Sequence, residues 1–350
     1  YMIIENPFDV SMMINKHNLD VMIDELKELA TSYNFCNTKV NKTLLALHLM
    51  RERLHTLKNN RYTTKCTLWG VKHNAHYPDL LERYIHTNCM DPCSSLYKRE
   101  IRKLLLAGTN IAELDISATV VYLFAKFITN DESMLNIYKH GDFYGLLNDK
   151  TRDEQKQLTQ IWLQGYYIPG IVYNKLFPVT SDYLKHTALQ DDDLYKRNSG
   201  LFRDKEVRLL NEMLNSDLPI INHLHDGYYL CNRHKAKCGA LIKKVWGDDV
   251  KYKVTDFAKD NKSDDDIRNI LQEIDWKEDV EDVVDFNNAP DFIIKHNMKL
   301  INHDPYGCLM GHELNNNGNC VYNDDGTNKL VPKSYVVQRL CRRICTDVII

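Results

Sequence analysis

The stretch that organises this chain is Ile111–Ser117, with the sequence IAELDIS. Its apolar first part, Ile111–Leu114, predicts a short strand that ends on the carboxylate of Asp115. The apolar run Ala118–Ala125 follows, so a strand-to-helix corner is expected here. A carboxylate at such a corner is a natural metal ligand, because the strand fixes its oxygen atoms and the turn leaves them exposed. An aspartate after a strand is common, however, so this interpretation depends on partners elsewhere in the chain.

Two later stretches provide such partners. Arg152 and Lys156 are four residues apart in a run with helical periodicity, so they share one face of the expected helix. Asp226 lies between two apolar runs and precedes Gly227, which predicts a β-hairpin with a carboxylate at its tip. The candidate site therefore consists of two strand-end carboxylates and two cations from one helix.

The composition is that of an ordinary globular protein. The chain has 350 residues, of which 43% are hydrophobic and 27% charged, which argues for two or three packed units and against extensive disorder. The net charge of -3 gives no overall basic field. Nucleic-acid binding would therefore depend on local basic stretches, of which the sequence offers Lys98–Lys103, Lys235–Lys244 and Arg339–Arg343.

The ten cysteines are scattered, and the sequence shows neither a secretory signal nor a long apolar span. We therefore expect a reducing, intracellular environment and no membrane association. Two groups have spacings that suggest metal binding, Cys89-x3-Cys93 and Cys231-x2-His234-x3-Cys238. Neither has a second pair at zinc-finger spacing, so free thiols are favoured over structural zinc.

The periodicity predicts a mainly helical chain. In the first part, helices are expected over residues 21–30 and 43–57, irregular structure over 59–95, and a basic amphipathic helix or strand over 98–106. Beyond the Asp115 corner, helices are expected over residues 120–129, 133–139, 152–163, 171–176, 205–214 and 239–245, with loops over 181–200. The last part predicts an acidic, solvated helix at 264–274, a hairpin at 315–330 and a basic helix at 333–344.

This combination of residues fits nucleotidyl transfer. That reaction needs two carboxylates held close together so that two Mg²⁺ ions can bridge them, activate the attacking 3′-hydroxyl and neutralise the pyrophosphate. It also needs cations that meet the triphosphate, which Arg and Lys at positions i and i+4 of a helix can supply. Each residue alone has an ordinary explanation, as a turn aspartate or a surface cation. The order of these four residues along the chain, and the sequence around each of them, make such ordinary explanations less convincing for all four together.

Four motifs resemble those of the single-subunit, phage-type RNA polymerases, a family that includes the mitochondrial enzymes and is related to the family A DNA polymerases. Leu114–Ser117 resembles motif A, Asp142–Gly145 the Asp-Ile-Tyr-Gly element, Thr151–Gly165 motif B, and Leu224–Gly227 motif C. The matched region covers roughly residues 98–257. The resemblance implies an α+β fold, a right-hand polymerase palm and fingers that is mainly helical outside a small antiparallel palm sheet.

The resemblance also assigns roles to residues. It implies two Mg²⁺ ions held by Asp115, Asp226 and the backbone carbonyl of Ile116, with Asp115, Asp226 and Lys156 as catalytic residues. It implies that NTPs contact Arg152, Lys156, Tyr144, Gln164 and Gly165. The expected activity is template-dependent addition of NTPs to an RNA 3′ end, with a DNA template and an RNA product as partners.

Three departures from the family pattern bear on these expectations. Gln164 replaces the motif B tyrosine that helps to recognise ribose, so sugar selection is open. The segment from Asp142 to Arg152 is shorter than usual, which implies a trimmed fingers region. No glycine of the sequence precedes an arginine, so the family's Asp-x-x-Gly-Arg element is absent.

These departures suggest a split enzyme, similar to a two-subunit phage form of the family. A second polymerase subunit would then supply the thumb and N-terminal parts. The expected division is a helical region at 1–97 that docks the partner or faces the template, palm and fingers at 98–257 (fingers about 130–200), and an extension at 258–350 packed on the palm. The resemblance places the protein in the cytoplasm of an infected host cell.

Three alternatives remain open. A family A DNA polymerase carries a glutamate five residues after the motif A aspartate and an acid after His-Asp, but this chain has Val120 and Gly227 there. An RNA-dependent RNA polymerase is suggested by Gly247-Asp248-Asp249, without the motifs that should precede it, so a helix-ending turn is favoured. The third alternative is a nucleic-acid-binding subunit without catalytic activity.

Overall fold

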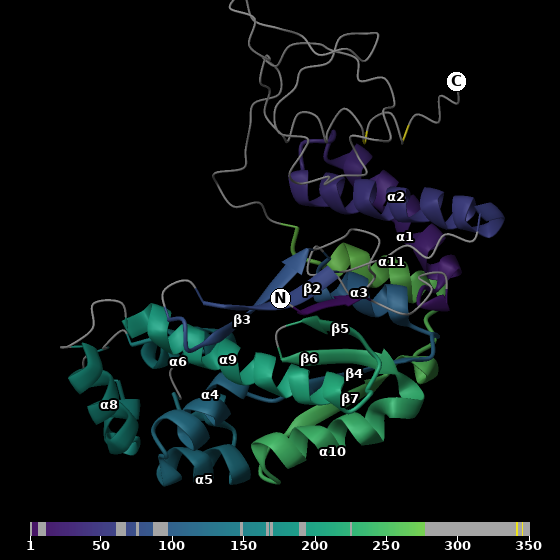
Figure 1. The fold of residues 1–350 in the computed structure, drawn as a ribbon. Helices are drawn as coiled ribbons and strands as arrows, with labels where there is room; N and C mark the ends of the chain where they lie inside the picture. The colour runs from purple at the N-terminus through teal and green to yellow at the C-terminus, as the bar shows by residue number, and fades with distance from the viewer. Residues whose placement is uncertain are drawn as a thin grey trace, which may run out of the picture. The chain divides into compact units, whose positions relative to one another are not determined.

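The computed structural model describes residues 2–5, 12–60, 68–74, 77–86, 97–147, 150–165, 168, 171–188, 194–224, 226–276, 341 and 345. These residues form a mainly helical α+β structure with one four-stranded and one three-stranded antiparallel sheet (Figure 1). None of the described helices combines the length and hydropathy needed to cross a lipid bilayer.

The chain divides into two compact units, each built from several separate segments. The first comprises Tyr1–Pro7, Leu68–His86 and Ile111–Asp256, and the second comprises Phe8–Thr67, Thr87–Asn110 and Phe257–Ile350. The three consecutive functional regions expected from the sequence stay a prediction.

The first unit contains both sheets. Its strands are β1 (Met2–Glu5), β2 (Leu68–His73), β3 (Leu81–His86), β4 (Ile111–Ile116), β5 (Ile220–Leu224), β6 (Gly227–Cys231) and β7 (Tyr252–Asp256). Its helices are α4 (Thr119–Leu123), α5 (Glu132–His140), α6 (Arg152–Leu163), α7 (Tyr173–Leu176), α8 (Pro178–Ala188), α9 (Leu194–Asn215) and α10 (Lys235–Trp246). Short helical turns are the π-helical η2 (Phe124–Ile128) and the 3₁₀ turns η3 (Phe143–Gly145) and η4 (Asn232–His234).

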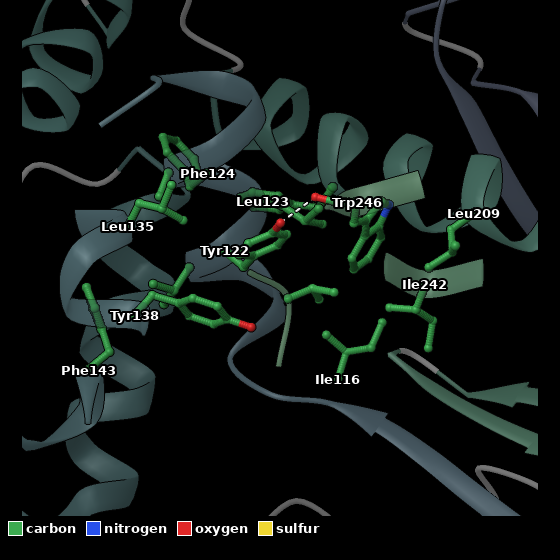
Figure 2. Close-up of a cluster of buried hydrophobic side chains, with 14 of the residues drawn as sticks. Ile116, Tyr122, Leu123, Phe124, Leu135, Tyr138, Phe143, Leu209, Ile242 and Trp246 are labelled. Carbon is green, nitrogen blue, oxygen red and sulfur yellow. Dashed lines mark hydrogen bonds between the residues drawn. The ribbon is translucent and has the colours of Figure 1, made fainter. Parts of the chain in front are cut away.

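The four-stranded sheet has the order β5-β6-β4-β7, so the strand predicted from Ile111–Ser117 is central. Alternate residues of β4 point to opposite faces of the sheet. Leu114 and Ile116 share one face and pack into a hydrophobic core with Tyr122 of α4 and with Ile242 and Trp246 of α10 (Figure 2). The Tyr122 hydroxyl donates to the Trp246 carbonyl, which satisfies a polar group inside this core. Each fully buried side chain of this size contributes roughly 2 kcal/mol of transfer free energy.

Two parts of the first unit differ from the sequence-based expectation. Residues 59–95 were expected to be irregular, but β2 and β3 pair along their full length and β1 adds to β2. Residues 181–200 were expected to be loops, but those that the structure describes, 181–188 and 194–200, belong to α8 and α9. Polar side chains are buried there: Asn198 donates to the Leu163 carbonyl and accepts from the Tyr183 hydroxyl. The polar composition that suggested a loop thus belongs to helices whose polar groups find tertiary partners.

The second unit is helical over its described residues. It contains α1 (Lys16–Ser32), α2 (Thr38–Asn60), α3 (Arg99–Leu106), the 3₁₀ turn η5 (Phe257–Lys259) and α11 (Asp264–Glu273). Asn15 caps α1 by accepting from the Asn18 backbone N–H, while the Asn18 side chain is buried and donates to the Leu104 carbonyl.

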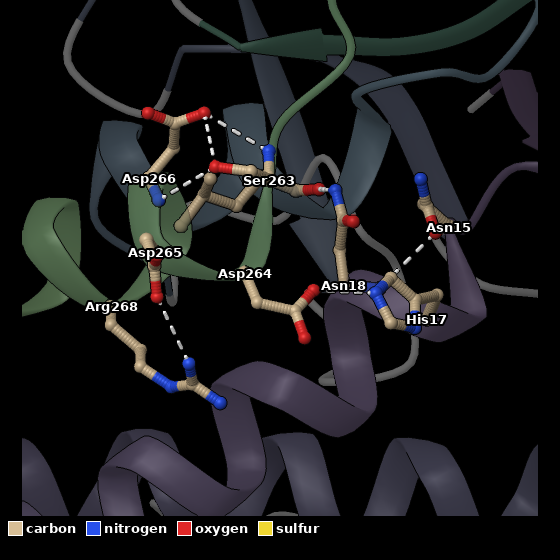
Figure 3. A network of polar contacts seen from close by, with 9 residues as sticks. Asn15, His17, Asn18, Ser263, Asp264, Asp265, Asp266 and Arg268 are labelled. Carbon is tan, nitrogen blue, oxygen red and sulfur yellow. Dashed lines mark hydrogen bonds and ion pairs between the residues drawn. The ribbon is translucent and has the colours of Figure 1, made fainter.

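Helix α11 begins with a capping box between Ser263 and Asp266 (Figure 3). It was expected to be solvated, but it buries Ile267 and Leu271 and packs on α1. The hairpin expected at 315–330 lies outside the described residues, as does the helix expected at 333–344 except for Cys341.

Candidate active site

Asp115 is the half-buried residue before the end of β4. In the sheet register it is opposite Gly227 on β6 and Lys253 on β7. Residues that are directly opposite in adjacent strands present their side chains to the same face. Leu114 and Tyr228 point to the core face of the sheet, so Asp115 points to the other face. Its neighbours across the strands are Gly227 and the exposed Lys253.

Asp226 lies in the turn between β5 and β6, one residue before Gly227. The Ile116 N–H donates to the Asp226 carbonyl at 3.1 Å, which extends the β4–β6 ladder by one step. Asp115 and Asp226 therefore lie at the same end of two hydrogen-bonded strands, as the sequence predicted. Strand alternation does not set the direction of the Asp226 side chain, because the residue is in a turn.

A contact that the sequence did not predict holds the Asp226 carboxylate. The Thr119 hydroxyl lies 2.6 Å from Asp226 Oδ2 and 3.0 Å from the Ile116 carbonyl oxygen. Thr119 is the first residue of α4, and the preceding Ala118 has a φ of 46°, in the left-handed region that favours glycine. The sharp turn at Ala118 thus directs the Thr119 side chain back over the end of β4.

A second group of side chains joins the Asp142–Gly145 element to α6. The Arg152 guanidinium donates to Asp142 Oδ2, and it lies 5.8 Å from the centroid of the Tyr144 ring. Asp142 Oδ1 also accepts from the Tyr144 backbone N–H at 3.2 Å. Asp142 therefore fixes both the turn that carries Tyr144 and the direction of Arg152.

Tyr144 connects this group to Asp226. Burial, followed by the negative charge of Asp226, raises the pKa of Tyr144 to about 12, while the positive charge of Arg152 opposes the shift. Charges act in this way only over short distances in a partly buried site. The phenol of Tyr144 therefore stays a protonated hydrogen-bond donor at neutral pH.

Helix α6 begins at Arg152, as predicted, because Thr151 and Glu154 form a capping box. Lys156 is exposed one turn after Arg152. Gln164 is the C-cap of the helix, and Gly165 ends it with a φ of 106°. The buried face of the helix includes the polar Gln155 and Thr159, whereas Ile161 is exposed.

The polar residues of this buried face have defined partners. The Gln155 side chain accepts from the Leu147 N–H and donates to the Lys150 carbonyl, and the Thr159 hydroxyl contacts the Tyr173 hydroxyl at 2.9 Å. These contacts fix the buried face of α6 against the segments before and after it.

The chemistry of the predicted donor set fits Mg²⁺. Asp115, Asp226 and the Ile116 carbonyl offer hard oxygen ligands, and Mg²⁺ is usually held by one or two carboxylates together with substrate phosphates. Over the described ranges, no three His, Cys, Asp or Glu side chains come together as a ready-made metal cluster.

The other candidate centres have ordinary structural explanations. Cys231 and Cys238 are free thiols, and burial in the core raises the pKa of Cys238 to about 12. The preference for free thiols over zinc at Cys231-x2-His234-x3-Cys238 stays a prediction, and Cys89 and Cys93 lie outside the described residues. Gly247 caps α10 with a φ of 102°, so Gly247-Asp248-Asp249 is a helix-ending turn, as favoured from the sequence.

No family model and no curated protein matches the sequence. Among solved structures, the chain is similar to the POL domain of Pol1 from M. smegmatis in complex with DNA primer-template and dNTP. The similarity covers 61% of this chain at 10% sequence identity with a TM-score of 0.36. It covers 52% of the polymerase chain, so this chain spans about half of that length. This is a distant likeness of fold to a polymerase domain, and the function proposed below rests on the site residues.

Proposed function

We propose that this chain is the catalytic subunit of a DNA-directed RNA polymerase and carries its palm and fingers. The observation that supports this most directly is the β4–β6 pairing, which brings Asp115 and Asp226 to one end of adjacent strands. The four-stranded antiparallel sheet would be the palm, and α5 to α9 would include the fingers. The second observation is that Arg152, the first residue of α6, donates to Asp142 and lies 5.8 Å from the centroid of the Tyr144 ring.

In this proposal, Asp115, Asp226 and the Ile116 carbonyl hold two Mg²⁺ ions. Bound Mg²⁺ lowers the pKa of the attacking 3′-hydroxyl and neutralises the charge that develops on the pyrophosphate. Thr119 keeps the Asp226 carboxylate and the Ile116 carbonyl directed toward the same point. The chain's own contribution is thus to fix hard oxygen atoms on a rigid sheet before substrate arrives.

The triphosphate would meet α6. Arg152 and Lys156 are exposed on successive turns, and both present cations to an approaching polyphosphate. Lys156 would also donate a proton to the leaving pyrophosphate. Tyr144 would contact the sugar or a phosphate with its neutral hydroxyl, and Gln164 with Gly165 would lie beside the incoming base and ribose.

RNA synthesis is proposed over DNA synthesis because of two residues. Val120 stands where family A DNA polymerases carry the glutamate that excludes a 2′-hydroxyl, and Gly227 stands where they carry an acid. An aliphatic side chain offers no charge or hydrogen bond against ribose. Which side chain would recognise the ribose 2′-hydroxyl is open, because Gln164 stands where the family has a tyrosine.

The other expectations from the sequence remain part of the proposal. The partners would be a DNA template, an RNA product, NTPs and a second polymerase subunit that supplies the thumb and N-terminal parts. The location would be the cytoplasm of an infected host cell. The support for a partner is the net charge of -3, because affinity for a nucleic-acid duplex grows with the number of phosphates neutralised.

Primer extension tests the proposal. The purified chain, alone and with co-expressed partners, is mixed with an RNA primer on single-stranded DNA, Mg²⁺ and either NTPs or dNTPs. We expect Mg²⁺-dependent extension with NTPs. Extension with dNTPs alone would favour the DNA polymerase alternative, and absence of extension with a duplex-binding partner present would favour the non-catalytic one.

Two substitutions identify the site in this assay. Asp115→Asn and Asp226→Asn should each reduce extension by at least about a thousandfold, because each removes a charge that holds Mg²⁺. The control is Asp182→Asn on the exposed surface of α8, which should extend at the normal rate. Normal extension by a folded Asp115→Asn or Asp226→Asn variant would show that the site is elsewhere.

A further inference from the structure

Glu113 is a buried carboxylate next to the proposed metal site. It precedes Asp115 by two residues on β4, so both side chains point to the same face of the sheet. Only 6% of Glu113 is exposed, and its neighbour across the sheet, Tyr229, is 2% exposed. The Tyr229 hydroxyl donates to Glu113 Oε1 at 2.6 Å, which fixes the carboxylate. The function proposed above gives Glu113 no role.

Gly227 lies next to this carboxylate. A Cβ atom at position 227 would lie 3.6 Å from Glu113 Oε1 and 3.2 Å from the Leu224 carbonyl oxygen. The φ of Gly227 is outside the left-handed region, so backbone conformation does not require a glycine here. The Glu113 carboxylate therefore reaches over the residue that is opposite Asp115 in the register and next to Asp226 in the sequence.

The charges near Asp115 give the Glu113 carboxylate an effect on cation binding. Asp115 has Lys253 opposite it on β7, and that positive charge weakens the attraction of Asp115 for a cation. Glu113 adds a negative charge to the same face and offsets Lys253. The Tyr229 hydroxyl holds Glu113 Oε1, so Glu113 acts on the site through its field.

We propose that Glu113 is a positioning residue of the metal site, held by Tyr229, that strengthens the binding of divalent cations at Asp115 and Asp226. This inference rests on the proposed function. Residues directly behind metal ligands typically change metal affinity or activity by 10- to 100-fold when they are substituted. Glu113→Gln keeps the shape of the side chain and an oxygen that accepts from Tyr229, but it removes the charge.

The test measures Mn²⁺ binding to the purified full chain by electron paramagnetic resonance, without nucleotide and independently of activity. Glu113→Gln should raise the Mn²⁺ dissociation constant roughly tenfold. Its thermal unfolding midpoint in the absence of metal should stay close to that of the unsubstituted chain. The matched control is Glu212→Gln on the exposed surface of α9, which should bind Mn²⁺ normally.

An unchanged dissociation constant in a folded Glu113→Gln variant would overturn the proposal. If that variant does not fold, Tyr229→Phe replaces it: this substitution releases the carboxylate and should weaken Mn²⁺ binding, and normal binding would again overturn the proposal. Failure of the proposed function gives a different result, because the Asp115→Asn variant would then bind Mn²⁺ as tightly as the unsubstituted chain.

Discussion

Thr119 shows how one side chain can set the geometry of the candidate site. Its hydroxyl has a single proton and lies close to both Asp226 Oδ2 and the Ile116 carbonyl oxygen. A hydrogen bond to a charged group contributes about 1.5–3 kcal/mol, so its loss would free Asp226 to rotate away. A displacement of this kind at a metal centre affects the rate far more than it affects folding.

We therefore expect Thr119→Val to lower the extension rate at least about tenfold, with a loss of unfolding free energy of about 1–3 kcal/mol. Thr119→Ser, which retains the hydroxyl, should keep most of the rate. Single-turnover extension and urea denaturation measure the two quantities. Equal rates for the Val and Ser variants would remove Thr119 from the site.

Asp142 competes with the nucleotide for Arg152 if the proposed function is correct. The two side chains form an exposed ion pair, and such pairs contribute no more than about 1 kcal/mol. Asp142→Asn keeps the side-chain oxygen that accepts from Tyr144 but removes the charge. We expect the KM for NTP to fall by about two- to fivefold, measured by steady-state extension. A higher KM would mean that Asp142 orients Arg152 and does not compete with the triphosphate.

At the scale of elements, the corner between β4 and α4 is conformationally strained. Ala118 occupies the left-handed region, which costs an L-residue with a Cβ atom roughly 1 kcal/mol. Glycine adopts this conformation without that cost. The strain lies three residues from Asp115 and directs Thr119 toward Asp226, a location typical of functional sites.

The variant Ala118→Gly should therefore raise the unfolding free energy by up to about 1 kcal/mol, measured by urea denaturation. The comparison is Ala125→Gly in the buried π-helical turn η2, which should lower it by about 1 kcal/mol or more. A loss of stability in Ala118→Gly as large as that in Ala125→Gly would show that the corner is not strained.

At the scale of the whole molecule, buried tyrosines of the first unit make stability depend on alkaline pH. Burial is the largest cause in each of three cases: it raises the pKa of Tyr138 and of Tyr144 to about 12, and it also raises the pKa of Tyr122. The unfolded chain loses these protons near pH 10. Between pH 10 and 12 the unfolded state is therefore ionised while the folded state is still protonated.

The sign follows from proton binding. The folded state holds more protons in this range, so the unfolding free energy is fully retained below pH 10 and falls as the pH rises toward 12. Urea midpoints measured from pH 8 to pH 12 should show this decline, and Tyr138→Phe should make it less steep. An identical slope for the Tyr138→Phe variant would show that Tyr138 does not contribute.

The sequence by itself determined the local elements of the site. Strand β4 and the β5–β6 hairpin follow from apolar runs that end on Asp115 and turn at Asp226-Gly227, and α6 follows from its capping residues and periodicity. The signals for each element lie within about ten consecutive residues, so each element can be recognised without knowledge of the rest of the chain. The residues proposed for catalysis were therefore predictable as individual positions.

Only the tertiary structure decided which of these residues meet. The β4–β6 register, the Thr119–Asp226 contact and the Glu113–Tyr229 hydrogen bond join residues more than 100 positions apart. The pairing of strands and the burial of polar helices such as α9 also depend on partners that no local pattern specifies. The physical reason is that local periodicity sets the face of an element, whereas the register and the hydrogen-bond partners are set by packing across the whole unit.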